Sequence, residues 1–227
     1  MKPARRGRPP RIFLLSPANC GGTRAQMVAS PTAAFDLAVR LRSREGAPLG
    51  EVFSFVSGLY FRGKLAYARR FARPPDPDDP IVAGGVLVIT PSAGLRSADT
   101  PLTLAGFHAF ARVPISIDNA SYREPLVRGA RALNRAAGPD CEIVLLGSIA
   151  SGKYVELLLP IFGERLLFPP DFIGRGDMSR GGLMLRCVTA DLELPYVPLQ
   201  GAVRHGARPP KLEPLRPKAK ARGGDPA

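Results

Sequence analysis

The sequence has no tryptophan, two histidines and three cysteines. Cys20, Cys141 and Cys187 are an odd number and form no CxxC pair, so neither a disulfide framework nor a zinc ribbon is indicated. Two histidines without ligand spacing do not indicate a catalytic zinc site either. We therefore expect no metal and no cofactor, and the free thiols fit a reducing cytoplasm.

Long apolar runs are also missing. No stretch reaches the ~18 unbroken apolar residues of a membrane-spanning helix. The apolar run that begins at Ile12 is too short for the core of a secretory signal. We expect a cytoplasmic protein without a membrane partner, and its 45% hydrophobic residues exclude disorder throughout the chain.

The formal charge of +13 lies mainly at the two ends of the chain. Residues 1–11 carry five basic and no acidic side chains, and residues 204–227 carry seven basic and two acidic ones. Both ends are rich in proline and glycine, which predicts disordered basic tails around a single domain at residues 12–203. Such tails raise affinity for polyanions, or serve solubility alone.

Alternating strand and helix patterns predict the fold class. Short apolar runs predict strands at residues 12–15, 86–90, 142–146 and 166–168. Helical spacing and capping signals, among them Ser30 before Pro31, predict helices at residues 30–46, 57–72, 103–111, 121–137, 151–162 and around 183–186. This order predicts a three-layer α/β fold with a mainly parallel sheet and helices on both faces.

The segment GSIASGKY matches a phosphate-binding loop in part. Gly147, Gly152 and Lys153 fit the spacing G-x-x-x-x-G-K between a predicted strand and a predicted helix. Tyr154 stands where such a loop needs a magnesium-binding hydroxyl, so nucleotide hydrolysis is not indicated. The alternatives are anion binding without hydrolysis, or an ordinary turn in which Lys153 is solvated.

Two further loops follow predicted strands. In FIGRGDMSRGG, Arg175 and Arg180 flank Asp177, which suits a phosphate or carboxylate ligand, or else Asp177 caps the next helix. In the loop after the first strand, Cys20 is a candidate nucleophile or a small apolar filler, and the base available to it is His108.

The predicted helix at residues 57–72 carries a basic face. Tyr60 and Tyr67 could stack on bases beside that face, or the face could simply be solvated. The candidate nucleic-acid-binding residues are Arg62, Lys64, Arg69 and Arg73.

The motifs FLLSPAN at residues 13–19 and SRGGLMLR at residues 179–186 resemble the two end motifs of the YaaA-like peroxide-stress proteins. Shorter motifs follow the order of related bacterial proteins, namely LY at 59–60, GL at 94–95 and YVELLLP at 154–160. The resemblance implies a three-layer α/β fold in a superfamily linked to DNA binding and nucleobase modification. It also implies that Gly147 and Lys153 belong to a family turn. The family's first loop carries a lysine where this chain has Asn19, which leaves the catalytic group unidentified.

The leading hypothesis is a protein that binds nucleic acid or a nucleotide-like anion in a cleft at the carboxyl ends of its strands. The expected ligand-binding residues are Ser16, Asn19, Gly147, Gly152, Lys153, Arg175 and Arg180. One alternative is an enzyme acting on a nucleobase or nucleoside, with Asp177 or Asp171 as acid or base and Cys20 as nucleophile. Another is an interaction protein that works through its tails.

Overall fold

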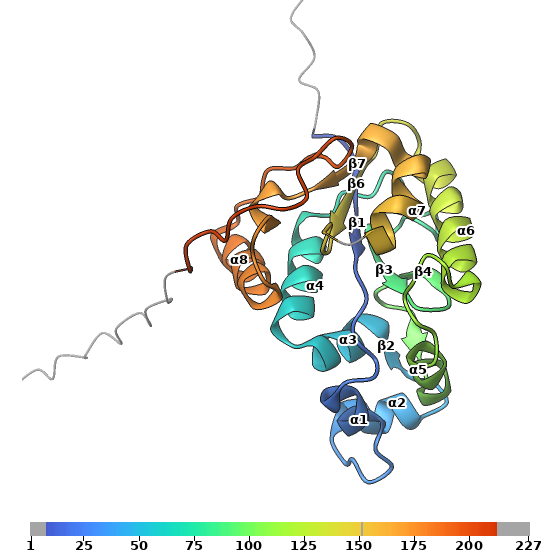
Figure 1. Cartoon of the computed structure of the whole chain (residues 1–227). Coiled ribbons are helices and arrows are strands. Elements are labelled where there is room, and N and C mark those ends of the chain that lie inside the picture. The colour runs from blue at the N-terminus through green and yellow to red at the C-terminus, as the bar shows by residue number, and fades with distance from the viewer. Residues whose placement is uncertain (1–7, 151, 213–227) are drawn as a thin grey trace, which may run out of the picture.

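The computed structural model describes residues 8–150 and 152–212 (Figure 1). Within them, the strands of the main sheet are β1 (Arg11–Leu15), β3 (Val86–Thr90), β4 (Gly94–Ser97), β6 (Glu142–Leu146), β7 (Leu166–Phe168) and β8 (Val197–Pro198). A small second sheet pairs β2 (Ala47–Pro48) with β5 (Pro101–Leu102).

The described helices alternate with these strands. They are α1 (Thr23–Ala29), α2 (Asp36–Arg42), α3 (Leu49–Ser57), α4 (Leu59–Phe71), α5 (Leu104–Ala111), α6 (Ala120–Ala137), α7 (Gly152–Phe162) and α8 (Asp177–Ala190). Two short 3-10 helices, Gly163–Arg165 and Pro170–Phe172, flank β7. None of the helices in the described part of the chain is long and apolar enough to span a bilayer.

The strand order of the main sheet is β4-β3-β1-β6-β7-β8. β1 pairs in parallel with β3 and β6, and β6 pairs in parallel with β7. β4 and β8 are antiparallel strands at the two edges. The prediction of a mainly parallel sheet in a three-layer α/β fold is confirmed.

Each face of the sheet packs into its own hydrophobic core. Phe13 and Leu15 of β1 join a core with α1 to α5 and α8, whereas Ile12 and Leu14 join a core with α6 and α7. Figure 1 shows α4 and α8 on one side of the sheet and α6 and α7 on the other. Because both faces are covered, β1 is apolar at successive positions instead of at alternate ones.

Helices α4 and α8 cross at a point where both carry glycine. A Cβ atom at Gly63 would lie 2.6 Å from the Gly181 carbonyl oxygen, and one at Gly181 would lie 2.7 Å from the Leu59 carbonyl oxygen. The two backbones therefore touch, as only glycine permits. This close crossing brings the side chains of α4 and α8 together near the carboxyl end of β1.

Several predicted boundaries were wrong. The helix expected at 30–46 is the shorter α2, Asp36–Arg42, because Ser30 and Pro31 follow the end of α1, where the Ser30 backbone N–H donates to the Met27 carbonyl, and do not start a helix. The helix expected at 57–72 begins at Leu59, because Gly58 has a φ of 60° and separates α3 from α4. The last helix is longer than expected and begins at Asp177.

The two ends of the predicted domain also differ in detail. Arg11, expected in the N-terminal tail, is the buried first residue of β1. Of the expected C-terminal tail, residues 204–212 are described, and the Ala207 carbonyl oxygen lies so close to Gly174 that it leaves no room for a Cβ there. Residues 1–7 and 213–227, with most of the predicted tails, lie outside the described residues.

Candidate ligand-binding site at the carboxyl edge of the sheet

A cavity of about 420 Å³ lies where β1 and β3 end. The loop after β1 lines it with residues 17–21, the loop after β3 with Pro91, and the start of α7 with Lys153 and Tyr154. The end of α5 and the following loop close it with residues 110–115, apart from Arg112. Parallel α/β sheets place ligands at this edge, so the position is the expected one.

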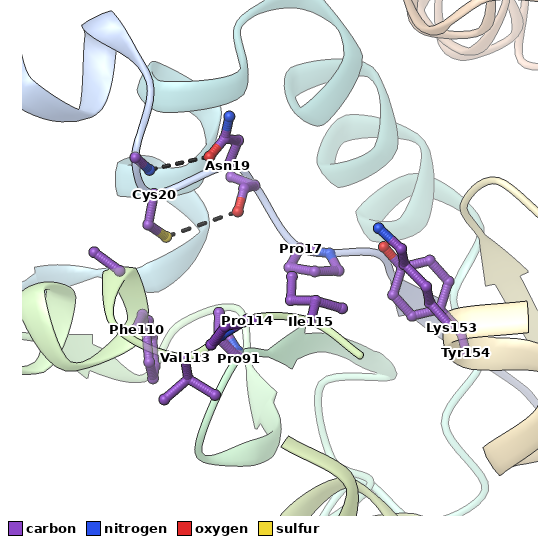
Figure 2. Close-up of a pocket in the computed structure, with 13 residues that line it drawn as sticks. Pro17, Asn19, Cys20, Pro91, Phe110, Val113, Pro114, Ile115, Lys153 and Tyr154 are labelled. Atoms are coloured by element: carbon purple, nitrogen blue, oxygen red, sulfur yellow. Dashed lines mark hydrogen bonds between the residues drawn. The ribbon is translucent and has the colours of Figure 1, made fainter. Parts of the chain in front are cut away.

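The cavity has a polar group at each end and apolar walls between them. Figure 2 shows Asn19 and Cys20 at one end and Lys153 and Tyr154 at the other, with Pro17 and Ile115 between. The Asn19 side chain accepts a hydrogen bond from the Gly21 N–H at 3.0 Å, which holds the loop in a tight turn. The arrangement suits a ligand with a flat apolar part and a charged or polar end.

The loop between β6 and α7 lies where the sequence placed it. Gly147 packs on Ser16 so closely that a Cβ atom would lie 2.9 Å from the Ser16 Cβ. At the start of α7, the Glu156 carboxylate folds back over Gly152 and fills the space that a Cβ would take. The start of α7 therefore holds a carboxylate of the chain itself, as expected where helix N–H groups carry partial positive charge.

Cys20 lines the cavity but is poorly suited to act as a nucleophile. Burial raises the pKa of its thiol to about 12, and its Sγ donates to the Ala18 carbonyl at 3.7 Å. The thiol is therefore protonated near neutral pH. No hydrogen bond joins Cys20 to His108, which is exposed, in the described part of the chain.

Beside the loop after β1 lies a group we call the buried polar cluster, formed by Ser16, Tyr60, Lys64 and Arg180, which are buried, and by Asp177 at its edge, whose side chain is 65% exposed. Lys64 is fully buried, and its Nζ donates to the Ser16 carbonyl at 2.6 Å and lies 2.8 Å from the Ser16 Oγ. Its Nζ also lies 4.5 Å from the centre of the Tyr60 ring. Burial, opposed by Asp177 and aided by Arg180, lowers the pKa of Lys64 to about 7.

Tyr60 is the second unusual member of the cluster. Its hydroxyl is buried and has no hydrogen-bond partner among the described residues. Burial raises the pKa of Tyr60, and the positive charge of Arg180 opposes that rise. Tyr154, which lines the cavity, has its pKa raised mainly by burial and further by Asp177, which also raises the pKa of Tyr60.

The first turn of α8 contributes to the cluster, and neither it nor the loop before it lines the cavity. Arg180 is 9% exposed and donates to the Phe172 carbonyl at 3.1 Å, with Asp177 at 3.4 Å. Arg175 donates to the carbonyls of Asp171, at 2.9 Å, and Pro210, at 3.4 Å, in a separate groove beside α8. Of the predicted ligand-binding residues, Asn19 and Lys153 line the cavity, whereas Ser16, Gly147, Gly152, Arg175 and Arg180 do not.

The basic face predicted on α4 is largely occupied by contacts within the chain. Lys64 lies in the interior, not on this face, and Tyr60 and Tyr67 are buried, so none of them reaches an external partner in this conformation. Arg69 forms an ion pair with Asp99. Arg73 pairs with Glu193 at 3.2 Å, which leaves Arg62 as the exposed, unpaired member among the described residues.

The sequence contained a signal for the buried lysine that the prediction missed. Lys64 is three residues after Phe61 and four before Ala68, both on the apolar stripe of the helix, so helical spacing places it on the buried side. Its partner Ser16 could not be found in this way, because the two residues meet only through the packing of α4 against β1.

Fold and geometry together define an α/β protein with a ligand-sized cavity at the carboxyl edge of a parallel sheet. A scan against protein-family models found no match, and searches of curated proteins and of solved structures found no significant match. The function is therefore argued from the site alone.

Proposed function

We propose that the protein binds a nucleotide-like anion in the cavity at the carboxyl edge of its sheet. The observation that supports this proposal is the pairing of apolar walls with a free ammonium group. Lys153 is exposed and has no ion-pair partner in the described part of the chain, and Phe110 and Ile115 line the wall. A planar base fits the wall, and its phosphate fits Lys153, with the Glu156 carboxylate as its competitor at the start of α7.

Titration calorimetry of the full chain with nucleoside monophosphates tests this proposal, with uncharged nucleosides as the comparison. We expect Lys153→Gln to weaken binding about tenfold, because a hydrogen bond to a charged group contributes roughly 1.5 kcal/mol. Arg44→Gln removes an equal charge from an exposed position that does not line the cavity, and should bind like wild type. Absence of binding, or an equal loss in both variants, would contradict the proposal.

A specific observation on α6 favours nucleic-acid binding as a second function. Arg128, Arg131 and Arg135 are exposed at spacings of three and four residues, so they lie on one face of the helix. None of them forms a hydrogen bond or an ion pair within the described residues. Together with Arg123, Glu124 and Val127 they line a groove of about 550 Å³.

This arginine face suits a phosphate backbone, because guanidinium groups bind phosphate oxygens in pairs and Glu124 is the single acid in the groove. Fluorescence anisotropy with a DNA duplex at several salt concentrations tests it. Changing Arg128, Arg131 and Arg135 to Gln should reduce the slope of log affinity against log salt by about 2.7, since each phosphate contact contributes about 0.9.

The control for this experiment removes the same charge from scattered positions by changing Arg24, Arg44 and Arg112 to Gln. These arginines are exposed and lie outside both α6 and the basic face of α4. If both triple variants lose the same slope, the duplex responds to net charge alone and the α6 face has no special role. If neither loses slope, the basic ends of the chain carry the binding.

A further inference from the structure

The buried polar cluster contains a cation that the rest of the chain does not neutralise. Lysine is seldom fully buried without an acidic partner. Lys64 is fully buried, and no carboxylate pairs with it in the described part of the chain. The closest polar atoms to its Nζ are the carbonyl oxygen and the hydroxyl of one residue, Ser16.

The geometry around Lys64 fits a neutral amine as well as a charged one. In the structure its Nζ donates to the Ser16 carbonyl at 2.6 Å and to the Ser16 Oγ at 2.8 Å, and when the amine is neutral its lone pair can instead accept the Ser16 hydroxyl proton over the same distance. The pKa of about 7 makes this neutral form abundant near neutral pH. The charged groups that face Lys64 are Asp177 and Arg180 of α8, and they act in opposite directions.

We propose that Ser16 and Lys64 form a nucleophile and base pair, in which Lys64 activates the Ser16 hydroxyl toward an acyl carbon. The hydroxyl proton passes to the Lys64 Nζ as the Ser16 Oγ forms a bond to the carbonyl carbon of an ester or amide. The leaving alcohol or amine then takes that proton from Lys64 as its bond to the carbon breaks. Water attacks the acyl-serine in the same way and releases the acid.

The position of Ser16 supports this assignment. It directly follows the central strand β1 and is 5% exposed; the next residue, Pro17, lines the cavity, whereas Ser16 itself does not. The proposal therefore places the acyl group against Pro17, next to the Ser16 Oγ. Gly147 packs against Ser16. A Cβ atom at position 147 would lie 3.2 Å from the Ser16 Oγ, so a larger residue there would crowd the hydroxyl. The Tyr60 hydroxyl is buried in the same cluster and has no hydrogen-bond partner among the described residues, so the proposal assigns it as the donor to the developing oxyanion.

A purely structural role for Lys64 makes a different prediction. A lysine that only holds the Ser16 carbonyl needs no hydroxyl at position 16, and the serine would then be as unreactive as any other buried serine. Ser54 provides the comparison, because its Oγ is also buried and has no partner in the described residues. Reactivity confined to Ser16 therefore distinguishes the two roles.

The test treats the full chain with a small alkyl fluorophosphonate and locates the adduct by mass spectrometry. Serine attack breaks the P–F bond, and the hydroxyl proton leaves to Lys64. We expect an adduct on Ser16, formed at a rate that rises with pH through about 7. Ser16→Ala should abolish it, Lys64→Met should slow it at least 100-fold, and Ser54→Ala should not change it.

Three outcomes would overturn the proposal: no adduct on the wild-type chain, an equal rate in Ser16→Ala, or a rate that Lys64→Met leaves unchanged. If Lys64→Met does not fold, Ser16→Ala still decides, because it keeps the backbone carbonyl that Lys64 binds. Nucleotide binding is measured separately by calorimetry, so its failure leaves this test intact.

Discussion

A buried basic side chain lies at each of two edges of the sheet, and acidic partners neutralise it at one edge but not at the other. At the amino edge, Arg11 of β1 forms ion pairs with Glu142 of β6 and with Glu193, and its guanidinium lies 4.4 Å from the centre of the Tyr196 ring. Burial lowers the pKa of Arg11, but Glu142 and Glu193 outweigh it and raise the pKa overall. At the carboxyl edge, Lys64 has no such partner, and burial lowers its pKa.

This difference separates a charge that stabilises the fold from one that does not. The Arg11 network continues through Tyr196 and Tyr67, whose hydroxyls are 2.6 Å apart, and Tyr67 accepts from the Leu194 N–H at 2.7 Å. It ties the segment before β8 to the start of β1. An unpaired buried lysine instead costs folding energy, and proteins retain such costs mainly at functional sites.

The largest expected loss of stability comes from removing Arg11, the neutralised basic side chain at the amino edge. Arg11→Met leaves Glu142 and Glu193 partly buried without their main partner, so we expect a loss of about 3 kcal/mol in the free energy of unfolding, measured in urea. Arg69→Met removes the exposed pair with Asp99 and should lose far less. If both variants lost a similar free energy of unfolding, burial would not distinguish the ion pairs of Arg11 from the Arg69–Asp99 pair.

The next effect concerns the backbone contact that assembles the carboxyl edge. Gly63→Ala places a methyl group 2.6 Å from the Gly181 carbonyl oxygen, so α4 and α8 must separate. We expect a loss of about 2 kcal/mol, typical of overpacking in a core. The space around Gly84 is open, with no atom within 4 Å of the position that a Cβ would take, so Gly84→Ala should unfold at nearly the wild-type urea concentration.

A smaller effect on stability, which depends on pH, is expected when Lys64 is replaced. Lys64→Met removes the buried charge, so the variant should be as stable as wild type or more stable near pH 7. The lysine pKa is 10.5 ordinarily and about 7 in the fold, so between these values the unfolded chain binds the extra proton. Wild type therefore gains stability relative to the variant as pH rises from 7 to 9.

The slope of that gain is at most about 1.4 kcal/mol per pH unit, the value for one proton. Taking the difference between wild type and Lys64→Met cancels the tyrosines and cysteines, which titrate in both. A difference that does not change with pH would show that Lys64 keeps its ordinary pKa in the fold, and that the two edges are electrostatically alike.

The smallest expected effect is at the start of α7, next to Lys153 and Tyr154, which line the cavity. Glu156→Gln removes the carboxylate that lies over Gly152 at the start of α7, so an anionic ligand meets less competition there. We expect nucleoside monophosphates to bind about threefold more tightly, from the size of a helix-terminus interaction. Glu164→Gln, in the 3-10 helix after the other end of α7, is the matched control and should bind like wild type.

Much of the fold was predictable because the buried strands have a clear local pattern. Runs such as residues 86–90 and 142–146 are mainly apolar, and they match β3 and β6 as the structure has them. The edge strand β4 was missed, because its sequence GLRS is short and half exposed. Ser30 and Pro31 misled the helix assignment, since a proline after a serine occurs both at helix starts and just beyond helix ends.

The sequence by itself determined the parallel sheet, its two covering layers and the loops that end at one edge, because strand periodicity and right-handed crossovers leave few other arrangements. Tertiary structure alone decided which charges are neutralised. Arg11 lies 131 residues from Glu142, and Lys64 lies 48 residues from Ser16. Whether a charge gains a partner or is desolvated depends on distances of a few ångströms across the folded core, which composition and spacing do not encode.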